Sequence, residues 1–303
     1  MPIESQGEPY AASTVKRRRA TSSEMDERAE FLIRYAEKHG PVSVRGLYYQ
    51  AEVAALPGID KTESSYAKVQ RQVLALRREK RLPYRAISDA TRWMRKVDSF
   101  DGPADAVRSW SRNYRRNLWK DAGELIEIWC EKDALAGVIF SVTDTYDVPL
   151  MVTRGYSSET FAHNAVEAYE YDNLNRKVFV YYLGDFDRSG RDAARSLAEK
   201  LHRFGEQFGV EIVFSELAVT EGQIRDLNLP TREPKRNTAA DRNWPFPFAC
   251  ELDAIPPDAM RSLVEKAINR HLPQRELRIL QEYEASEREQ LERMANLFAE
   301  VAP

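Results

Sequence analysis

The chain has 303 residues, which is enough for one large domain or two to three ordinary ones. Hydrophobic residues make up 43% of it, so it can bury a core, yet no apolar run approaches the roughly 20 residues that cross a bilayer. The two cysteines exclude a disulfide framework and a four-cysteine zinc site. We therefore expect a soluble cytoplasmic protein with no membrane partner.

Charge is distributed unevenly along the chain, although the net charge is only −3. Residues 1–120 hold 24 Lys and Arg against 15 Asp and Glu, whereas residues 121–303 hold 21 against 33. This asymmetry indicates a basic module that binds a polyanion, joined to an acidic module with another task. Chance variation of surface charge is the alternative.

Residues 1–23 show almost no apolar periodicity and carry a basic cluster from Lys16 to Arg19. Their composition predicts a flexible basic arm. Such an arm either touches phosphates or is a solvated tail.

Three predicted helices follow the arm. Apolar spacing and capping residues place them over Met25–His39, from Ser43 to Val53, and over Ser64–Lys80. Residues Tyr84–Trp93 then fit a small β wing. Three helices and a hairpin are typical of a winged helix-turn-helix, so we expect a DNA-binding domain of this type over residues 24–120. A generic helical bundle is the alternative.

Basic residues concentrate on the third predicted helix and just after it, which favours DNA binding over an ordinary solvated face. The candidate DNA-binding residues are Lys68, Arg71, Arg77, Arg78, Lys80 and Arg81. Double-stranded DNA is the expected partner. Further on, Arg108 to Lys120 mixes basic and aromatic residues, which fits either more of this surface or an amphipathic linker.

From Leu125 onward, short apolar runs alternate with helical stretches. The runs are Leu125–Cys130, Leu150–Thr153, Lys177–Leu183 and Glu211–Leu217. This alternation predicts a multi-domain α/β protein in which residues 121–225 form a parallel sheet with crossover helices. Residues 226–303 are expected to form a mostly helical C-terminal extension that begins with a polar loop.

Carboxylates follow two of the predicted strands: Glu131 ends the first, and Asp185 and Asp187 follow a later one. The carboxyl ends of parallel strands form a binding crevice, and residues two apart on an extended segment point the same way. Three such carboxylates would suit Mg²⁺, with Mn²⁺ possible, and the ion would neutralise and orient a phosphodiester. Capping of the next helix is the alternative for the Asp-x-Asp pair.

Glu131 after one strand and the segment Gly184 to Asp187 after another resemble the Toprim domain of topoisomerases, primases and some nucleases. The turn Thr153 to Tyr156 is similar to one in the topoisomerase VI A subunit and its meiotic double-strand-break relative. The nucleophile segment of that subgroup follows the pattern Arg-(Asp/Glu)-x-(Phe/Tyr)-Tyr. Arg45 to Tyr49 reads Arg-Gly-Leu-Tyr-Tyr, so Gly46 departs from the pattern.

This resemblance covers roughly residues 25–220, and the region from Asp226 on looks more like that of short phage or bacterial relatives. It implies a winged helix followed by a Rossmann-like Toprim domain, a 5′-phosphotyrosyl DNA intermediate and a homodimer. Strand passage would need a separate ATPase subunit, because the chain has no Gly-Lys-Ser/Thr phosphate loop. The implied catalytic residues are Tyr49 as nucleophile, Arg45 as its supporting arginine, and Glu131, Asp185 and Asp187, the last three also as metal ligands.

Tyr48 and Tyr49 cannot be equally buried on an isolated helix, because adjacent residues point about 100° apart. We expect Tyr48 in the core, and the family pattern assigns exposure to Tyr49. Lys132 is expected either to hold phosphate or to be exposed. Glu251 and Asp253 could each add a carboxylate to the site, although Asp253 is rather expected to cap the helix that begins near Pro257.

Two other functions fit the residues. One is a hydrolytic Toprim nuclease of a mobile element or defence system, in which the three carboxylates activate water, Tyr49 is structural and no covalent intermediate forms. Gly46 favours this function slightly. The other is a non-catalytic DNA-binding adaptor, against which the intact acidic triplet argues.

Overall fold

A computed structural model describes residues 20–88, 98–120, 122–172, 176–236, 238–272 and 274–301. The predicted basic arm lies outside these residues apart from its last four positions. Residues 89–93 of the predicted β wing also lie outside them.

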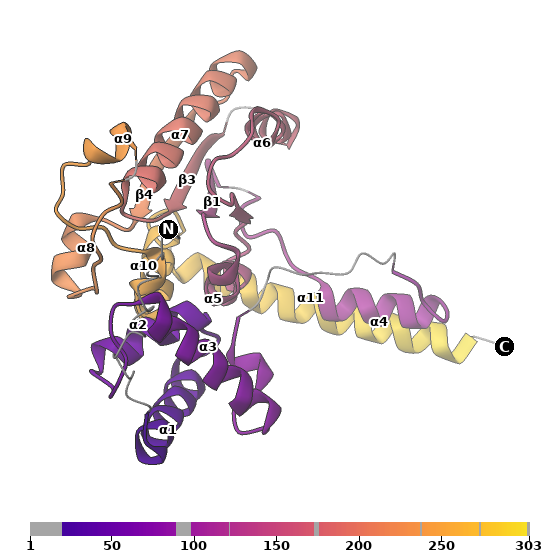
Figure 1. The fold of residues 1–303 in the computed structure, drawn as a ribbon. Coiled ribbons are helices and arrows are strands. Elements are labelled where there is room, and N and C mark those ends of the chain that lie inside the picture. The colour runs from indigo at the N-terminus through magenta and orange to yellow at the C-terminus, as the bar shows by residue number, and fades with distance from the viewer. Residues whose placement is uncertain are drawn as a thin grey trace, which may run out of the picture.

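A four-stranded sheet with the strand order β2-β1-β3-β4 forms the centre of the molecule, and all its strands are parallel (Figure 1). The strands are β1 (Glu124–Cys130), β2 (Leu150–Val152), β3 (Lys177–Leu183) and β4 (Ile212–Ala218). The two central strands pair along their whole length, from Glu124 opposite Lys177 to Cys130 opposite Leu183. The predicted α/β architecture with a parallel sheet is confirmed.

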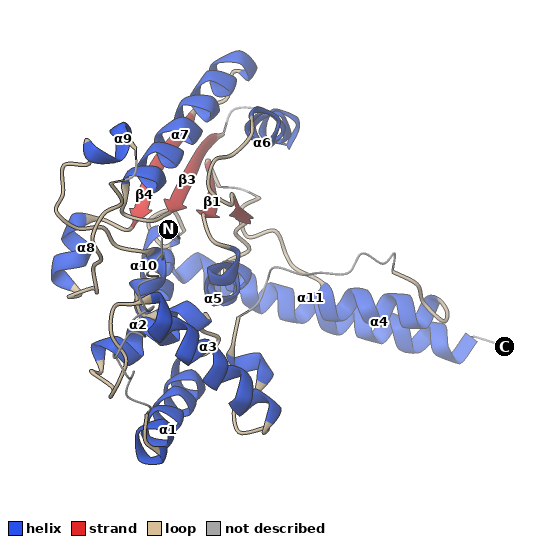
Figure 2. Ribbon diagram, viewed as in Figure 1, coloured by secondary structure: helices blue, strands red, loops and turns tan. Residues whose placement is uncertain are grey.

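Helices cover both faces of the sheet (Figure 2). They are α5 (Asp133–Thr145) and α10 (Pro257–Ile268) on one face, and α6 (Glu159–Asp172) and α7 (Arg188–Phe208) on the other. Alternate residues of β3 enter different cores: Val180 and Tyr182 pack with α6 and α7, whereas Tyr181 and Leu183 pack with α5 and α10. Because β3 is buried on both faces, its sequence is a continuous apolar run.

Three helices precede the sheet: α1 (Ser22–His39), α2 (Val44–Val53) and α3 (Glu63–Arg78). Their N-caps are Thr21, Ser43 and Thr62 in turn. The side-chain hydroxyl of each accepts a hydrogen bond from a backbone N–H in the first turn of its helix. Their core is continuous with the α5 and α10 side of the sheet. Figure 1 shows this three-helix unit at the end of the sheet to which the strand arrows point, which brings α2 to the carboxyl ends of the strands.

The first part of the predicted β wing is not a strand. Tyr84–Ala86 forms a single 3₁₀ turn, η1, and Ile87 makes an isolated parallel bridge with Val42. Val42 donates to the carbonyl of Ala86 and accepts from Ser88, at 3.0 and 2.9 Å. The backbone of this segment therefore pairs with the α1–α2 connection instead of with a neighbouring wing strand.

An arm of two packed helices, α4 (Pro103–Asn113) and α11 (Gln274–Val301), extends away from the sheet (Figure 1). The apolar spacing of α11 lapses at Glu284, where the structure buries a carboxylate. That carboxylate accepts a 2.9 Å hydrogen bond from the backbone of Arg116 and lies 2.8 Å from a guanidinium nitrogen of Arg288. The basic and aromatic stretch before β1 is thus the partner of the C-terminal helix.

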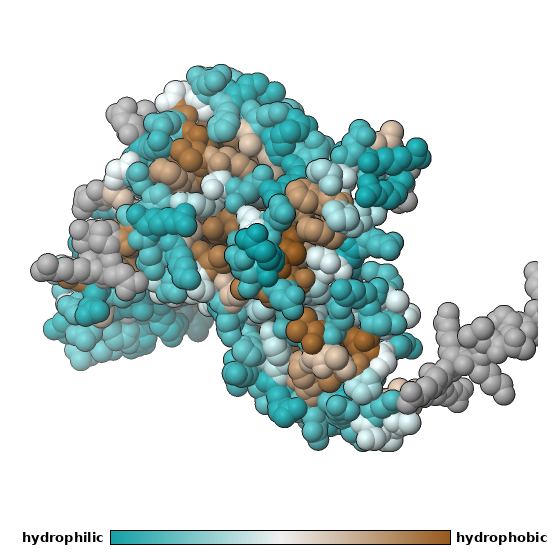
Figure 3. Space-filling model, turned by 90° about the vertical axis from the view of Figure 1, so that its left-hand side faces the viewer, coloured by the Kyte–Doolittle hydropathy of each residue, from teal (hydrophilic) through white to brown (hydrophobic). Residues whose placement is uncertain are grey.

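The polar region before α10 contains short elements: α8 (Glu221–Asp226), α9 (Ala239–Arg242) and a 3₁₀ turn, η2 (Leu252–Ala254). Among the described helices, none has the length and apolar character to span a membrane. The face drawn in Figure 3 is largely hydrophilic and is interrupted by hydrophobic residues in several places.

Candidate functional site

Glu131 and Asp185 meet at the carboxyl ends of the two central strands. The carboxylate of Glu131 accepts a 3.0 Å hydrogen bond from the backbone nitrogen of Asp185. Gly184 permits this approach, because a Cβ there would lie 2.9 Å from the Glu131 carboxylate and 2.5 Å from the ring of Tyr182. The structure therefore brings together two of the three predicted metal ligands.

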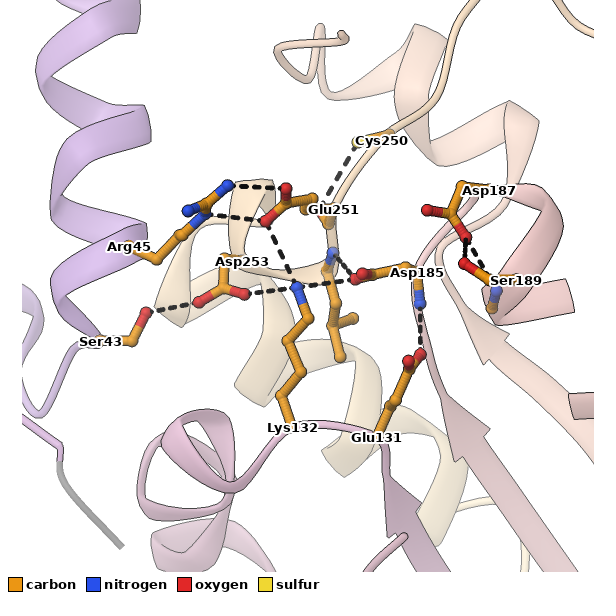
Figure 4. A network of polar contacts seen from close by, with 12 residues as sticks. Ser43, Arg45, Glu131, Lys132, Asp185, Asp187, Ser189, Cys250, Glu251 and Asp253 are labelled. Carbon is orange, nitrogen blue, oxygen red and sulfur yellow. Dashed lines mark hydrogen bonds and ion pairs between the residues drawn. The ribbon is translucent and has the colours of Figure 1, made fainter. Parts of the chain in front are cut away.

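Asp187, the third predicted ligand, points elsewhere (Figure 4). Its Oδ1 caps α7 by accepting 2.8 Å hydrogen bonds from Ser189 and from the backbone of Gly190, and its Oδ2 accepts one of 2.8 Å from Arg232. These partners lower its pKa below the ordinary value, although burial alone would raise it. Asp187 thus adopts the capping role that was the alternative prediction for this motif.

Lys132 stands in the middle of the acidic side chains (Figure 4). Its ammonium nitrogen lies 2.8 Å from Oδ2 of Asp253, 2.9 Å from Oδ1 of Asp185 and 3.5 Å from Glu251. Burial by itself would lower the pKa of Lys132, but these carboxylates raise it above its ordinary value. The predicted surface exposure does not describe this cation, whose side chain is only 24% exposed, and the alternative of a phosphate contact stays a prediction.

Asp253 does not cap α10, so that prediction is wrong. The helix begins at Pro257 with Pro256 as its cap and no side-chain cap. The turn η2 directs Asp253 instead toward α2, where its Oδ1 accepts a 2.8 Å hydrogen bond from the hydroxyl of Ser43. The same hydroxyl accepts from the backbone of Gly46 at 2.9 Å, and a Cβ at Gly46 would lie 3.2 Å from it. This close packing is a local reason for glycine at that position.

Tyr48 and Tyr49 are both buried, with 5% and 7% of their surfaces exposed, so the expectation of an exposed Tyr49 is wrong. Tyr48 donates to the carbonyl of Asp60 at 2.9 Å. Tyr49 lies near the acidic network, since Glu251, Arg45 and Lys132 all act on its hydroxyl, and α2 packs against η2. Burial and the charge of Glu251 raise the pKa of Tyr49, while Arg45 opposes the rise through its charge and a hydrogen bond.

Glu251 joins the segment from Arg45 to Tyr49 to the strand ends. Arg45 donates to both of its carboxylate oxygens, from Nε at 2.9 Å and from Nη2 at 2.8 Å. Lys132 lies 3.5 Å from one oxygen, and Nε of Arg232 lies 3.4 Å from the other. Burial works to raise the pKa of Glu251, but these three cations bring it below the ordinary value.

The surplus of negative charge in this network favours a cation, and its donors are the oxygen ligands that Mg²⁺ prefers. Six carboxylates accompany three cations; the carboxylates are Glu63, Glu131, Asp185, Asp187, Glu251 and Asp253, and the cations are Arg45, Lys132 and Arg232. The pKa of Glu131 is raised by burial and by the charge of Asp185, and that of Asp185 is raised by burial despite Lys132. In the described part of the chain, no three His, Cys, Asp or Glu side chains are grouped to hold a metal ion. A site of one or two carboxylates, completed by water and phosphate oxygens, is nevertheless the usual Mg²⁺ arrangement, and Glu131 with Asp185 fits it.

The candidate DNA-binding residues lie on α3 and the turn that follows it. Three of them line a cavity of about 460 Å³ that also touches α1, namely Lys68, Arg71 and Arg81. The guanidinium of Arg77 lies 4.2 Å from the centre of the Tyr84 ring, and Arg78 and Lys80 are exposed. Within the described ranges, no hydrogen bond or ion pair links any of the six to the strand-end network.

Sequence reasoning missed Arg232 altogether, because nothing distinguishes it within its polar loop. It gave only minor roles to Lys132 and Glu251. One usable signal was present: Glu251 and Asp253 repeat the acid-x-acid spacing of Asp185 and Asp187. Compared with known protein families and curated proteins, the chain matches neither a family model nor a curated protein.

Proposed function

We propose that this protein is a Mg²⁺-dependent DNA-cleaving transesterase of the topoisomerase VI A type, with Tyr49 as its nucleophile. The observation that carries the proposal is the connection of Tyr49 to the strand-end carboxylates. Arg45 lies one helical turn before Tyr49 and binds Glu251, and Lys132 links Glu251 to Asp185. A nucleophile, two cations suited to phosphate and a pair of metal-binding carboxylates thus belong to one contiguous network.

The proposed reaction is an in-line displacement at a DNA phosphodiester. The hydroxyl oxygen of Tyr49 attacks phosphorus and loses its proton, and the 3′-oxygen leaves with the electron pair of the broken bond and takes up a proton. The product is a 5′-phosphotyrosyl bond and a free 3′-hydroxyl. Arg45 and Lys132 favour the phenolate of Tyr49 and stabilise the crowded, negatively charged transition state. Mg²⁺ held by Glu131 and Asp185 supplies neutralisation of the phosphodiester charge.

The proposal includes the partners expected from the sequence. Double-stranded DNA would contact the basic side chains of α3, two copies would make paired cuts, and a separate ATPase subunit would be needed for strand passage. The reverse attack of the 3′-hydroxyl on the phosphotyrosine reseals the strand without ATP, because the bond energy is conserved in the covalent intermediate.

A hydrolytic nuclease is the second candidate, and the burial of Tyr49 favours it. A tyrosine with 7% of its surface exposed and a raised pKa is a poor nucleophile until its surroundings open. In the hydrolytic reaction water attacks phosphorus next to Glu131 and Asp185, and no bond forms between protein and DNA.

A trapping assay separates the two candidates. The protein is incubated with Mg²⁺ or Mn²⁺ and end-labelled duplex DNA, the reaction is stopped with denaturant, and label attached to protein is measured. We expect an adduct that disappears in Tyr49→Phe and in Asp185→Ala but persists in Tyr48→Phe, the matched neighbour whose hydroxyl binds Asp60. Cleavage without an adduct, unchanged in Tyr49→Phe and lost in Asp185→Ala, would establish the nuclease instead.

A further inference from the structure

Three basic side chains from distant parts of the chain converge on one carboxylate. Arg45 comes from α2, Lys132 follows β1, and Arg232 comes from the polar loop after α8. Each lies within 3.5 Å of an oxygen of Glu251. Each cation also contacts another carboxylate, but among the described residues Glu251 is the one that all three contact.

Arg232 contributes a donor that Glu251 does not satisfy. Its Nε is buried without a hydrogen-bond partner, and at 3.4 Å its approach to Glu251 is an ion-pair contact only. Buried donors are almost always hydrogen-bonded, so an unsatisfied one beside a carboxylate points to another occupant. A phosphodiester suits this set better, because it has more oxygens and accepts the paired N–H groups of a guanidinium as a carboxylate does.

The carboxylate of Glu251 occupies a place beside both reacting partners. Its charge acts on the hydroxyl of Tyr49, and Lys132 bridges it to Asp185. An anion bound in the same place would lie between the nucleophile and the metal-binding carboxylates. An attack by Tyr49 requires the scissile phosphate to lie beside its hydroxyl, and the charge of Glu251 already acts there.

We propose that Arg45, Lys132 and Arg232 form the binding site for the scissile DNA phosphate, and that Glu251 fills this site as an internal substitute until DNA displaces it. The identification of the phosphate as a DNA phosphodiester rests on the proposed function. The side chain of Glu251 can turn out of the site without unfolding its segment, because the flanking backbone is held independently. Cys250 exchanges two backbone hydrogen bonds with Phe186, and the backbone of Leu252 donates to Asp185.

Binding of fluorescently labelled duplex DNA without divalent metal tests the proposal. We expect Glu251→Gln to bind about tenfold more tightly than the unsubstituted protein, because the variant removes the competing charge. Glu63→Gln is the matched control: its carboxylate also lies 3.2 Å from Arg45, but it is 79% exposed and does not contact Lys132 or Arg232. The proposal is wrong if Glu251→Gln binds no more tightly than Glu63→Gln.

A second pair of variants decides the matter if Glu251→Gln does not fold. Arg232→Gln should weaken binding about tenfold, whereas Arg236→Gln, four residues further along the same loop and exposed, should weaken it far less. Equal losses in the two variants would overturn the proposal, since they would reflect general charge alone.

The outcome is independent of the cleavage reaction, because the tighter binding of Glu251→Gln should also appear in the Tyr49→Phe background. Tighter binding without any covalent adduct would keep the phosphate site and reject the transesterase. A covalent adduct without tighter binding of Glu251→Gln would support the transesterase and reject the phosphate site.

Discussion

Ser43 donates a buried 2.8 Å hydrogen bond to Asp253, which lies 210 residues further along the chain. The same hydroxyl caps α2 by accepting from Gly46. One oxygen atom thus fixes both the start of the helix that carries Tyr49 and the docking of that helix against η2. Its removal would affect the local helix and the joint between the three-helix unit and the sheet together.

Ser43→Ala should lower the free energy of unfolding by about 2–3 kcal/mol, because it removes a helix cap and leaves a buried carboxylate oxygen with one partner fewer. Thr21→Ala is the matched control, since Thr21 caps α1 at the surface. It should cost about 1 kcal/mol. Urea unfolding monitored by tryptophan fluorescence measures both, and equal costs would show that the bond to Asp253 contributes nothing.

Lys132→Met should destabilise the fold by about 3 kcal/mol at neutral pH, because it leaves Asp185, Asp253 and Glu251 close together without their shared cation. The loss should shrink as the pH falls. The pKa of Asp185 already lies above its unfolded value, and removal of Lys132 raises it further. As the pH falls, Asp185 is therefore protonated earlier in the variant than in the parent, which removes part of the repulsion between the carboxylates.

Unfolding of this variant and of the parent at pH 5 and pH 7.5 measures the effect. Lys61→Met is the control, because Lys61 is exposed and 3.6 Å from Glu52. It should change stability by less than about 1 kcal/mol at either pH. A deficit for Lys132→Met that stays constant with pH would contradict the role given to the buried carboxylates.

Asp187→Asn and Asp187→Ala separate the structural role of Asp187 from its chemical role. Asparagine caps helices nearly as well as aspartate, so Asp187→Asn should retain most of the stability, whereas Asp187→Ala should lose about 1–2 kcal/mol. The folded pKa of Asp187 lies below its ordinary value of 3.8, so its ionised form stabilises the fold above that pH. This stability is lost as the pH falls through the folded pKa.

Adduct formation by the folded Asp187→Asn protein then tests the predicted catalytic role. We expect at least a tenfold loss, about 1.4 kcal/mol in the activation free energy, because the variant weakens the ion pair that holds Arg232 beside Glu251. Full activity in Asp187→Asn would leave Asp187 with the capping function alone.

Gly190→Ala should destabilise the protein by about 1–3 kcal/mol and displace the segment from Gly184 to Asp187. A Cβ at Gly190 would lie 2.4 Å from the carbonyl oxygen of Asp185, a backbone atom that cannot rotate away. Gly222→Ala, also in a helix, meets nothing closer than 3.9 Å and should stabilise by about 0.5–1 kcal/mol. Thermal unfolding of the two variants compares them directly, and a neutral Gly190→Ala would contradict the packing seen at this turn.

The parallel sheet could be predicted from the sequence because its signal is local. Lys177–Leu183 is an apolar run bounded by polar residues, and its ends coincide with those of β3. The meeting of Glu131 and Asp185 followed from the general rule that parallel strands end at one edge of a sheet. These expectations needed no knowledge of which distant residues touch.

The features that were missed depend on contacts between distant segments. Tyr49 is buried because η2, some two hundred residues later, covers it, and helical periodicity carries no information about that contact. In the described part of the predicted wing, the backbone beside Ile87 pairs with Val42. This contact also joins segments that are distant in the sequence, so no local pattern indicates it. The ion pairs of Lys132 could not be predicted, because its three acidic partners are scattered over the second half of the chain.

The pairing of α4 with α11 sets an order of events during synthesis. Ser111 donates to the backbone of Arg288, 177 residues later, and most of the sheet is encoded between them. A ribosome adding about 5–20 residues per second takes on the order of ten seconds or more to make that stretch. During this interval α4 has been made but lacks its partner, while β1, β3 and their helices can assemble once they emerge. The arm is therefore the last part of the described chain to be completed, and a chain that ends before α11 would have its sheet with α4 uncovered.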